Sequence, residues 1–277
     1  MANFYTANDL EILIATKNRT NLDFLLPMFP FSHFSNFNIL IVNQSTNCLL
    51  NSNFPTVKII NSSEVGLSKS RNLALKNAAK NICLIADDDV VYFENFVSDI
   101  IYAFNSLPNP AIVTFNHSRI GLDAPKNQSK IAFKHNRKTI LEVCSVEIAF
   151  NRPEITSNRI SFDEHFGLGS YFETAEEFLF LRNSLRQKLR LFYYPSVIVS
   201  HPLISSGRQE GKKELIYARS ALIYKTKGIY VYFWLSKYLF FLYRKGFISK
   251  SDYVKKFKVG LSGIKKFKEL EKTKNHK

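Results

Sequence analysis

The sequence predicts an α/β protein whose first half forms a parallel sheet and whose C-terminal part is a basic, helical extension. Short apolar runs rich in β-branched residues alternate with segments of helical periodicity, which is typical of βαβ units. The chain has 277 residues and is 45% hydrophobic, which suffices for one large α/β domain or two small ones. Towards the C-terminus the composition shifts to lysine and aromatic residues.

Five strands and two helices are expected in the first part of the chain. A helix is predicted over residues 69–79, with Ser68 as its N-cap, because apolar residues recur there at helical spacing. A second helix is predicted over residues 94–105, since Pro108 and Pro110 would end it. The strands are the apolar runs 11–15, 38–42, 57–60, 82–86 and 111–115.

The middle of the chain gives weaker signals. Residues 121–137 are polar and mixed, so an irregular loop is expected there. Regular structure is expected to resume at residues 143–152. The elements predicted after it are a glycine-containing stretch over 162–178, a helix through Leu185, and two short strands over 191–193 and 197–199.

The net charge of +15 is concentrated at the C-terminus. Residues 206–277 contain 19 Lys and Arg against 5 Asp and Glu, whereas residues 1–205 contain 19 against 18. The basic part also contains the most apolar stretch of the chain. Basic and apolar residues together indicate an anionic membrane surface as the partner, and no nucleic acid is expected.

Two helical segments account for this basic part. Residues 229–243 are apolar at 13 of 15 positions, but they fall short of the about 20 residues of a spanning helix, so no transmembrane helix is expected. The next segment, which Gly260 and Gly263 would weaken, has one apolar and one basic face. Its apolar positions are Val254, Phe257, Leu261, Ile264, Phe267 and Leu270. We expect this second helix to bind the membrane, or alternatively to form a homo-oligomer interface.

The cysteines and the N-terminus bear on location. Cys48, Cys83 and Cys144 are odd in number, widely spaced and without a CxxC pattern, which favours a reducing compartment. No signal peptide is apparent in the first residues. A cytoplasmic protein, peripheral on the inner face of the cell membrane, is therefore expected.

Three consecutive carboxylates, Asp87-Asp88-Asp89, directly follow the apolar run ICLIA. Ligands of parallel α/β sheets bind at the carboxyl ends of the strands. Carboxylate oxygens, together with substrate phosphates, bind Mg²⁺ or Mn²⁺. Taken alone, such a triplet is more often a solvated turn or a helix N-cap cluster than a metal site.

The order of segments resembles that of the bacterial family 2 glycosyltransferases with the GT-A fold, over about residues 10–202. Each matching segment is a weak motif by itself, but six in the same order are specific. They are LIATKNR, LIVNQST, EVGLSKSRNLAL, LIADDDV, FDEHFGLG followed by AEEFLFLR, and SHP. The resemblance implies a catalytic domain over 1–205, divided at about residue 115 into a nucleotide-sugar half and an acceptor half, and a separate extension over 206–277.

The resemblance also implies roles for individual residues. Asp89 and His201 would hold the metal, although a lone histidine after a strand is more often structural. Asp87 would lie on the nucleotide side, and the role of Asp88 is undecided. Many relatives carry an aspartate where this chain has Asn43-Gln44, which leaves the base of the nucleotide open. The remaining donor residues implied are Thr16, Arg19, Asn43, Gln44, Gly66, Arg71 and Asn72.

An acidic pair stands where the family places the catalytic base. Glu177 would take the proton of the acceptor hydroxyl, with Glu176 in support, although the choice within the pair is open. Acidic residues at a helix start also complement the helix dipole, which is the structural alternative. Arg208 and Lys212 would close over the diphosphate, unless they are only solvated surface charges.

The function implied is metal-dependent, inverting transfer of a sugar from a nucleotide diphosphate sugar, foremost a UDP-sugar, to a hydroxyl. The acceptor expected is a lipid-linked glycan or glycolipid of bacterial surface polysaccharide biosynthesis. One alternative is a nucleotidyltransferase acting on a sugar phosphate, but ATKNRTN lacks the glycines that such a loop usually has. Another is a non-enzymatic module that binds RNA or a membrane.

Overall fold

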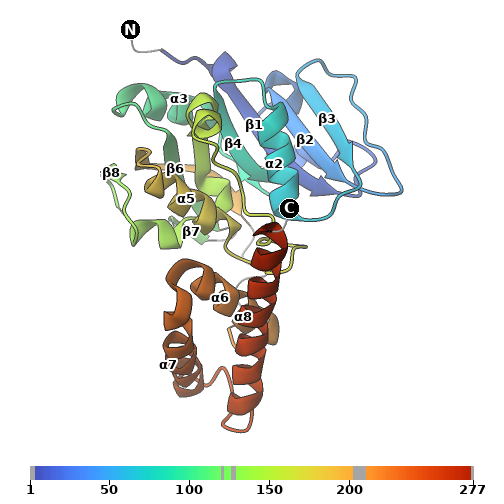
Figure 1. Ribbon diagram of the computed structural model, residues 1–277. Coiled ribbons are helices and arrows are strands. Elements are labelled where there is room, and N and C mark those ends of the chain that lie inside the picture. Colours follow the sequence, from blue (N-terminus) through green and yellow to red (C-terminus); the bar gives the residue numbers. More distant parts are fainter. Residues whose placement is uncertain (1–3, 120–121, 126–128, 202–209, 276–277) are drawn as a thin grey trace. The chain divides into compact units, whose positions relative to one another are not determined.

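The computed structural model describes residues 4–119, 122–125, 129–201 and 210–275 (Figure 1). The chain divides into two compact units. The first comprises Met1–Asp163 and Glu176–Leu203, and the second comprises Glu164–Ala175 and Ile204–Lys277. The segment Glu164–Ala175, which the sequence places in the catalytic part, thus packs with the C-terminal unit.

The first unit is built on one ten-stranded sheet in which eight strands have the order β3-β2-β1-β4-β9-β6-β10-β5, while β7 pairs with β6 and β8 pairs with β10. The strands are β1 Leu10–Lys17, β2 Ile39–Gln44, β3 Val57–Ser62, β4 Ile82–Asp87, β5 Val91–Tyr92, β6 Ile112–Arg119, β7 Leu122–Pro125, β8 Phe133–Lys134, β9 Ile148–Asn151 and β10 Leu191–His201. Strands β3, β2, β1 and β4 pair in parallel. Strand β9 pairs antiparallel to both β4 and β6, and β6 pairs in parallel with β10. The longer strands other than β9 therefore run in one direction.

Helices cover both faces of this sheet. They are α1 Leu25–Met28, α2 Leu67–Asn77, α3 Phe96–Ser106, α4 Arg152–Ser157 and α5 Glu176–Arg186. Because successive strand residues point to opposite faces, Ile12 and Ile14 pack with the α1 and α3 side, whereas Leu13 packs with α2 and α5. Figure 1 shows α2 and α5 on the same side of the sheet. Two apolar layers thus hold the sheet, and its strand ends remain available for polar residues.

The five predicted strands of the first part and both of its helices are present. Helix α2 begins at Leu67 rather than at Lys69, and the residue before it is Gly66, at φ 126° and ψ 128°. The N-cap predicted at Ser68 is therefore wrong, because Ser68 is buried inside the first turn. A side chain would strain the positive φ of Gly66, which explains a glycine there.

The second part of the chain is more regular than predicted. Strands β7 and β8 lie within the segment 121–137, which was expected to be an irregular loop. The two strands expected over 191–193 and 197–199 are one continuous strand, β10, with shifted register between Tyr193 and Val197. Pro195 lies at this shift and lacks the N–H of a regular ladder, so the strand is irregular without ending there.

The second unit is helical. Its helices are α6 Lys213–Lys227, α7 Val231–Arg244 and α8 Tyr253–Asn275. Phe267 of α8 is buried, and its ring lies 6.0 Å from those of Phe166 and Phe172. The apolar face predicted for α8 is therefore used inside this unit. None of the helices in the described residues is long and apolar enough to cross a membrane.

The two glycines of α8 allow neighbouring helices to approach closely. A Cβ on Gly263 would lie 2.2 Å from the carbonyl oxygen of Tyr217 in α6, and one on Gly260 would lie 2.6 Å from Leu235 in α7. The helix does span both glycines, although isolated glycine lowers helix propensity. Their role here is packing, which the sequence pattern alone does not indicate.

We expect Gly263→Ala to destabilise the second unit by about 1–3 kcal/mol, because the added methyl group overlaps a carbonyl that cannot move without shifting α6. Thermal unfolding and limited proteolysis of the full chain measure this effect. Ser262→Ala, one residue earlier on the exposed side of α8, is the matched control and is expected to unfold like the unsubstituted protein. Equal stability of the two variants would contradict the close packing described.

Candidate active site at the carboxyl ends of β1, β2 and β4

Polar side chains line up across the carboxyl ends of the parallel strands. Thr16 of β1 pairs in register with Asn43 of β2, and Asn43 pairs with Asn61 of β3. On the other side of β1, Ala15 pairs with Asp87 of β4. Strand order changes direction at β1 and β4, which is where open α/β sheets bind ligands.

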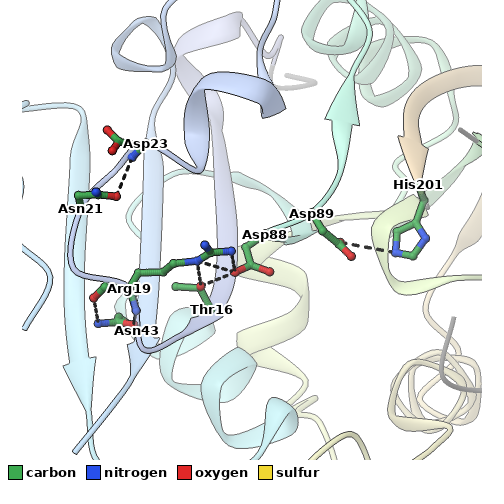
Figure 2. A network of polar contacts seen from close by, with 8 residues as sticks. All are labelled: Thr16, Arg19, Asn21, Asp23, Asn43, Asp88, Asp89 and His201. Atoms are coloured by element: carbon green, nitrogen blue, oxygen red, sulfur yellow. Dashed lines mark hydrogen bonds and ion pairs between the residues drawn. The ribbon is translucent and has the colours of Figure 1, made fainter. Parts of the chain in front are cut away.

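Asp88 is bonded to two of the predicted nucleotide residues (Figure 2). Its Oδ2 accepts hydrogen bonds from Thr16 Oγ1 at 2.5 Å, from Arg19 Nη2 at 2.8 Å and from Arg19 Nε at 3.1 Å. The Arg19 guanidinium also lies 4.8 Å from the centre of the Phe24 ring. Asp88, whose role the sequence leaves undecided, thus has more contacts with the predicted donor residues than Asp87 or Asp89 has.

Side-chain amides hold the loops around this group. Asn43 is buried, and its amide exchanges two hydrogen bonds of 3.0 Å with the main chain of Arg19. Gln44 Nε2 donates to the carbonyls of Glu64 and Gly66, at 2.8 and 3.0 Å. Both residues therefore support the donor loops, and a direct contact of either with a nucleotide base stays a prediction.

Asn72 has a similar supporting geometry. Its Nδ2 donates to the carbonyl of Phe162 at 3.0 Å, and its Oδ1 accepts from the Phe162 N–H at 2.8 Å. The pair fixes the chain just before the segment 164–175. The expected donor contact of Asn72 remains a prediction, since these bonds show only a positioning role.

Arg71 is buried between two carboxylates. Its Nη2 donates to Asp87 Oδ1 at 2.9 Å, and its Nη1 donates to Glu176 Oε1 at 3.0 Å. Burial lowers the pKa of Arg71, but Asp87 and Glu176 more than offset this and raise it. Arg71 is therefore not a solvated surface charge. The guanidinium ties the end of β4 to the first residue of α5.

Glu177 differs from Glu176 in its surroundings. Glu176 is bonded to Arg71, whereas Glu177 is a half-buried residue on the first turn of α5. Burial of its carboxyl group and the neighbouring charge of Glu176 raise the pKa of Glu177 to about 8. A carboxyl group that titrates near neutral pH suits proton transfer. Glu177 therefore has the properties of a general base, and Glu176 those of a positioning residue.

Asp89 and His201 form the candidate metal-binding pair (Figure 2). Asp89 Oδ1 lies 3.8 Å from His201 Nε2, and the Asp89 side chain is 55% exposed. Burial raises the pKa of Asp89, His201 lowers it, and Asp87 and Asp88 raise it further. A bound cation would offset the repulsion among these carboxylates.

The pair fits a divalent ion that takes its other ligands from a substrate. Mg²⁺ and related ions are often held by one or two protein groups together with phosphate oxygens and water. The part of the chain that the structure describes contains no cluster of three or more His, Cys, Asp or Glu with the geometry of a metal site. A metal would therefore depend on the diphosphate for much of its coordination.

The structure adds residues to the site that carried no sequence signal. Ser145 Oγ donates to Asp87 Oδ2 at 3.4 Å. His117 Nδ1 lies 2.7 Å from Glu147 Oε1, and the His117 ring lies 6.3 Å from that of His201. These residues come from β6 and the 3-10 turn before β9, where no motif marks them. Arg208 lies outside the described residues, and Lys212 directly precedes α6 in the second unit.

Comparison with solved structures identifies the fold. No protein-family model and no curated protein sequence matches the chain. The structure of S. aureus TarS residues 1–349 with UDP has a TM-score of 0.55 at 15% identity, covering 88% of this chain and 76% of that chain. The structure of TarS residues 1–349 with UDP-GlcNAc has a TM-score of 0.55 at 13% identity, covering 92% of this chain and 81% of that chain.

A mannosyltransferase from Pyrobaculum calidifontis, PcManGT, was solved with GDP-Man and Mn²⁺. It has a TM-score of 0.49 at 10% identity, covering 83% of this chain and 71% of that chain. At these identities the likeness concerns the fold. The mixed α/β sheet flanked by helices is shared with TarS, and this confirms the fold class predicted from the sequence.

The raised pKa of Glu177 predicts a pH-dependent effect on stability. A carboxyl group whose pKa is higher in the folded state contributes stability below its unfolded pKa, and that contribution is lost as the pH rises to about 8. Glutamine stays neutral at every pH. We therefore expect Glu177→Gln to raise the melting temperature clearly near about pH 9 and little near about pH 5.

Calorimetry of the two proteins across this pH range tests the effect. Glu94→Gln removes an exposed carboxylate of the same unit and is expected to show no such pH-dependent gain. A melting temperature of Glu177→Gln that parallels the unsubstituted protein at all pH values would refute the raised pKa.

Proposed function

We propose that the protein is a metal-dependent, inverting glycosyltransferase that moves a sugar from a nucleotide diphosphate sugar to an acceptor hydroxyl. The observation that carries the proposal is the division of the acidic residues among three partners. Asp88 bonds Arg19, Asp89 lies beside His201, and Asp87 is joined through Arg71 to the helix of Glu177. Each carboxylate can therefore have a different role in the proposed reaction.

The nucleotide would bind beside Thr16 and Arg19. Arg19 is only partly buried and already neutralised by Asp88, so its exposed edge offers N–H donors to a nucleotide or phosphate oxygen. The fold likeness to TarS, solved with UDP and UDP-GlcNAc, supports a UDP-sugar as the donor. Asn43 and Gln44 would act by keeping the loops of this pocket in place.

Asp89 and His201 would hold Mn²⁺ or Mg²⁺. An imidazole ligand favours Mn²⁺, because Mg²⁺ prefers oxygen ligands. When bound, the ion supplies positive charge that stabilises the leaving diphosphate. This would make a separate general acid unnecessary.

Glu177 would act as the catalytic base. It accepts the proton of the acceptor hydroxyl as that oxygen forms a bond to the anomeric carbon, while the bond from this carbon to the diphosphate oxygen breaks. The bonding electrons leave with the diphosphate, and attack from the opposite side inverts the anomeric centre. Glu176, fixed by Arg71, contributes the negative charge that raises the proton affinity of Glu177.

We further propose a lipid-linked glycan or glycolipid as acceptor, in bacterial surface polysaccharide biosynthesis. The strongly basic second unit supports a cytoplasmic protein that is peripheral on the inner, anionic face of the cell membrane. In this arrangement the donor comes from solution and the acceptor from the lipid surface.

Binding of UDP with Mn²⁺ should raise the melting temperature, because the ligands bind only the folded protein. Asp89→Asn is expected to lose the additional shift that Mn²⁺ gives and to keep a smaller shift with UDP alone. Thermal scans with UDP, GDP and dTDP, each with and without Mn²⁺, measure both effects. No shift with any of the three nucleotides would count against the proposal.

Turnover should depend on pH and on Glu177. Since the base must be deprotonated, kcat/KM is expected to rise with pH and to level off above about 8. Glu177→Gln should lower kcat by about a thousandfold and leave the UDP-induced thermal shift intact. Glu94→Gln is again the matched control. Full activity of Glu177→Gln would place the base elsewhere.

A further inference from the structure

Helix α7 has one face inside the second unit. Val231, Leu235, Leu239 and Leu242 are all fully buried, and the last three pack in the core of this unit with Ile216 and Ile248. At about 100° per residue these four positions fall within one narrow stripe of the helix. The opposite stripe is therefore free to meet something outside the unit.

That outer stripe is aromatic and cationic. Phe233, Lys237, Phe240 and Arg244 fall within about 60° of one another, opposite the buried stripe. Phe233 is 75% exposed and Phe240 is 53% exposed. Large apolar residues continue the surface before and beside it: Ile229, Tyr230, Phe241, Tyr243 and Phe247. A surface this apolar usually marks a binding site.

The charge around α7 is of one sign. Residues 225–251 contain six Lys and Arg and no Asp or Glu. Aromatic side chains on one stripe with cations between them are the composition of helices that lie in the boundary between lipid headgroups and acyl chains. Lysine and arginine stems can bury their methylene groups while the charges reach the headgroups.

Helix α8 lacks this property, although the sequence pattern indicates it more strongly. Ile264 and Phe267, the central residues of its apolar face, are buried within the unit. Phe267 lies against the rings of Phe166, Phe172 and Tyr224. The amphipathic pattern of α8 is explained by helix packing, so it no longer indicates a lipid contact.

We propose that the outer stripe of α7, with the short turn Gly228–Tyr230 before it, inserts into the interface of a membrane containing anionic lipid. The charges favour lipid over a second copy of the chain. A symmetric dimer through this stripe would bring Lys237 and Arg244 of both copies together, whereas anionic headgroups neutralise them.

Trp234 provides a native probe of the insertion. It is the one tryptophan of the chain, it lies on α7, and its ring stacks on Tyr238 at 4.7 Å. The full chain is mixed with vesicles of phosphatidylcholine, with or without phosphatidylglycerol. We expect Trp234 fluorescence to be quenched by brominated acyl chains only when phosphatidylglycerol is present.

Two pairs of substitutions separate the apolar and the ionic contributions. Phe233→Glu with Phe240→Glu should weaken vesicle binding by at least about tenfold. The double substitution removes both aromatic rings from the lipid contact and adds two negative charges, which anionic headgroups repel. Lys237→Gln with Arg244→Gln should reduce the preference for phosphatidylglycerol and its salt dependence. Ile131→Glu with Leu141→Glu, two exposed apolar positions of the first unit, is the matched control and should bind like the unsubstituted protein.

Three outcomes would overturn the proposal: full vesicle binding by the Phe233→Glu, Phe240→Glu protein, binding that ignores phosphatidylglycerol, or a solution dimer that these two substitutions dissociate. Melting temperature and the UDP-induced shift are measured on every variant. Unchanged values show that folding and nucleotide binding are intact, so the membrane result stands apart from the proposed transfer reaction.

Discussion

The buried guanidinium of Arg71 is the interaction on which the candidate site depends. It bonds Asp87 at the end of β4 and Glu176 at the start of α5, so it fixes the helix that carries Glu177 against the strand that carries the acidic triplet. Breaking a buried ion pair costs about 3–5 kcal/mol. Arg71, Asp87 and Glu176 are therefore expected to be retained or lost together. The candidate donor side and the candidate base are held in place relative to each other by two side chains, those of Arg71 and Glu176, that are 105 residues apart in sequence.

Sequence reasoning is most successful where local signals determine the structure. Strands β1 to β4, strand β6 and helices α2 and α3 follow from apolar periodicity and from proline or glycine at their ends, which act within a few residues. The acidic triplet is interpreted as a site because an apolar strand precedes it and the flanking motifs occur in the order of the family. The sequence analysis pairs Asp89 with His201, but it does not predict the bonds of Asp88 to Arg19 and of Asp87 to Arg71, because strand order sets them.

For other features the sequence does not reveal which side-chain groups and surfaces already have partners inside the protein. Asn43 and Asn72 resemble ligand contacts in the motif, yet their amides bond the main chains of Arg19 and Phe162. The amphipathic pattern of α8 resembles that of a lipid-facing helix, but Tyr224 of α6 and Phe172 of the segment 164–175 pack against Phe267 on its apolar face. Gly263, which weakens a helix in isolation, is what lets α6 approach it.

The path of the chain between its two units limits how such a protein can be recombined. Residues Glu164–Ala175 leave the first unit, pack in the second through Phe166 and Phe172, and return at Glu176. The helical unit is thus assembled from two separate stretches of sequence, one of which ends beside the acidic pair. A gene fusion that exchanged only the C-terminal stretch would separate Phe166 and Phe172 from their aromatic partners in α6 and α8. The segment that leads to Glu177 and the C-terminal helices would therefore have to be exchanged together.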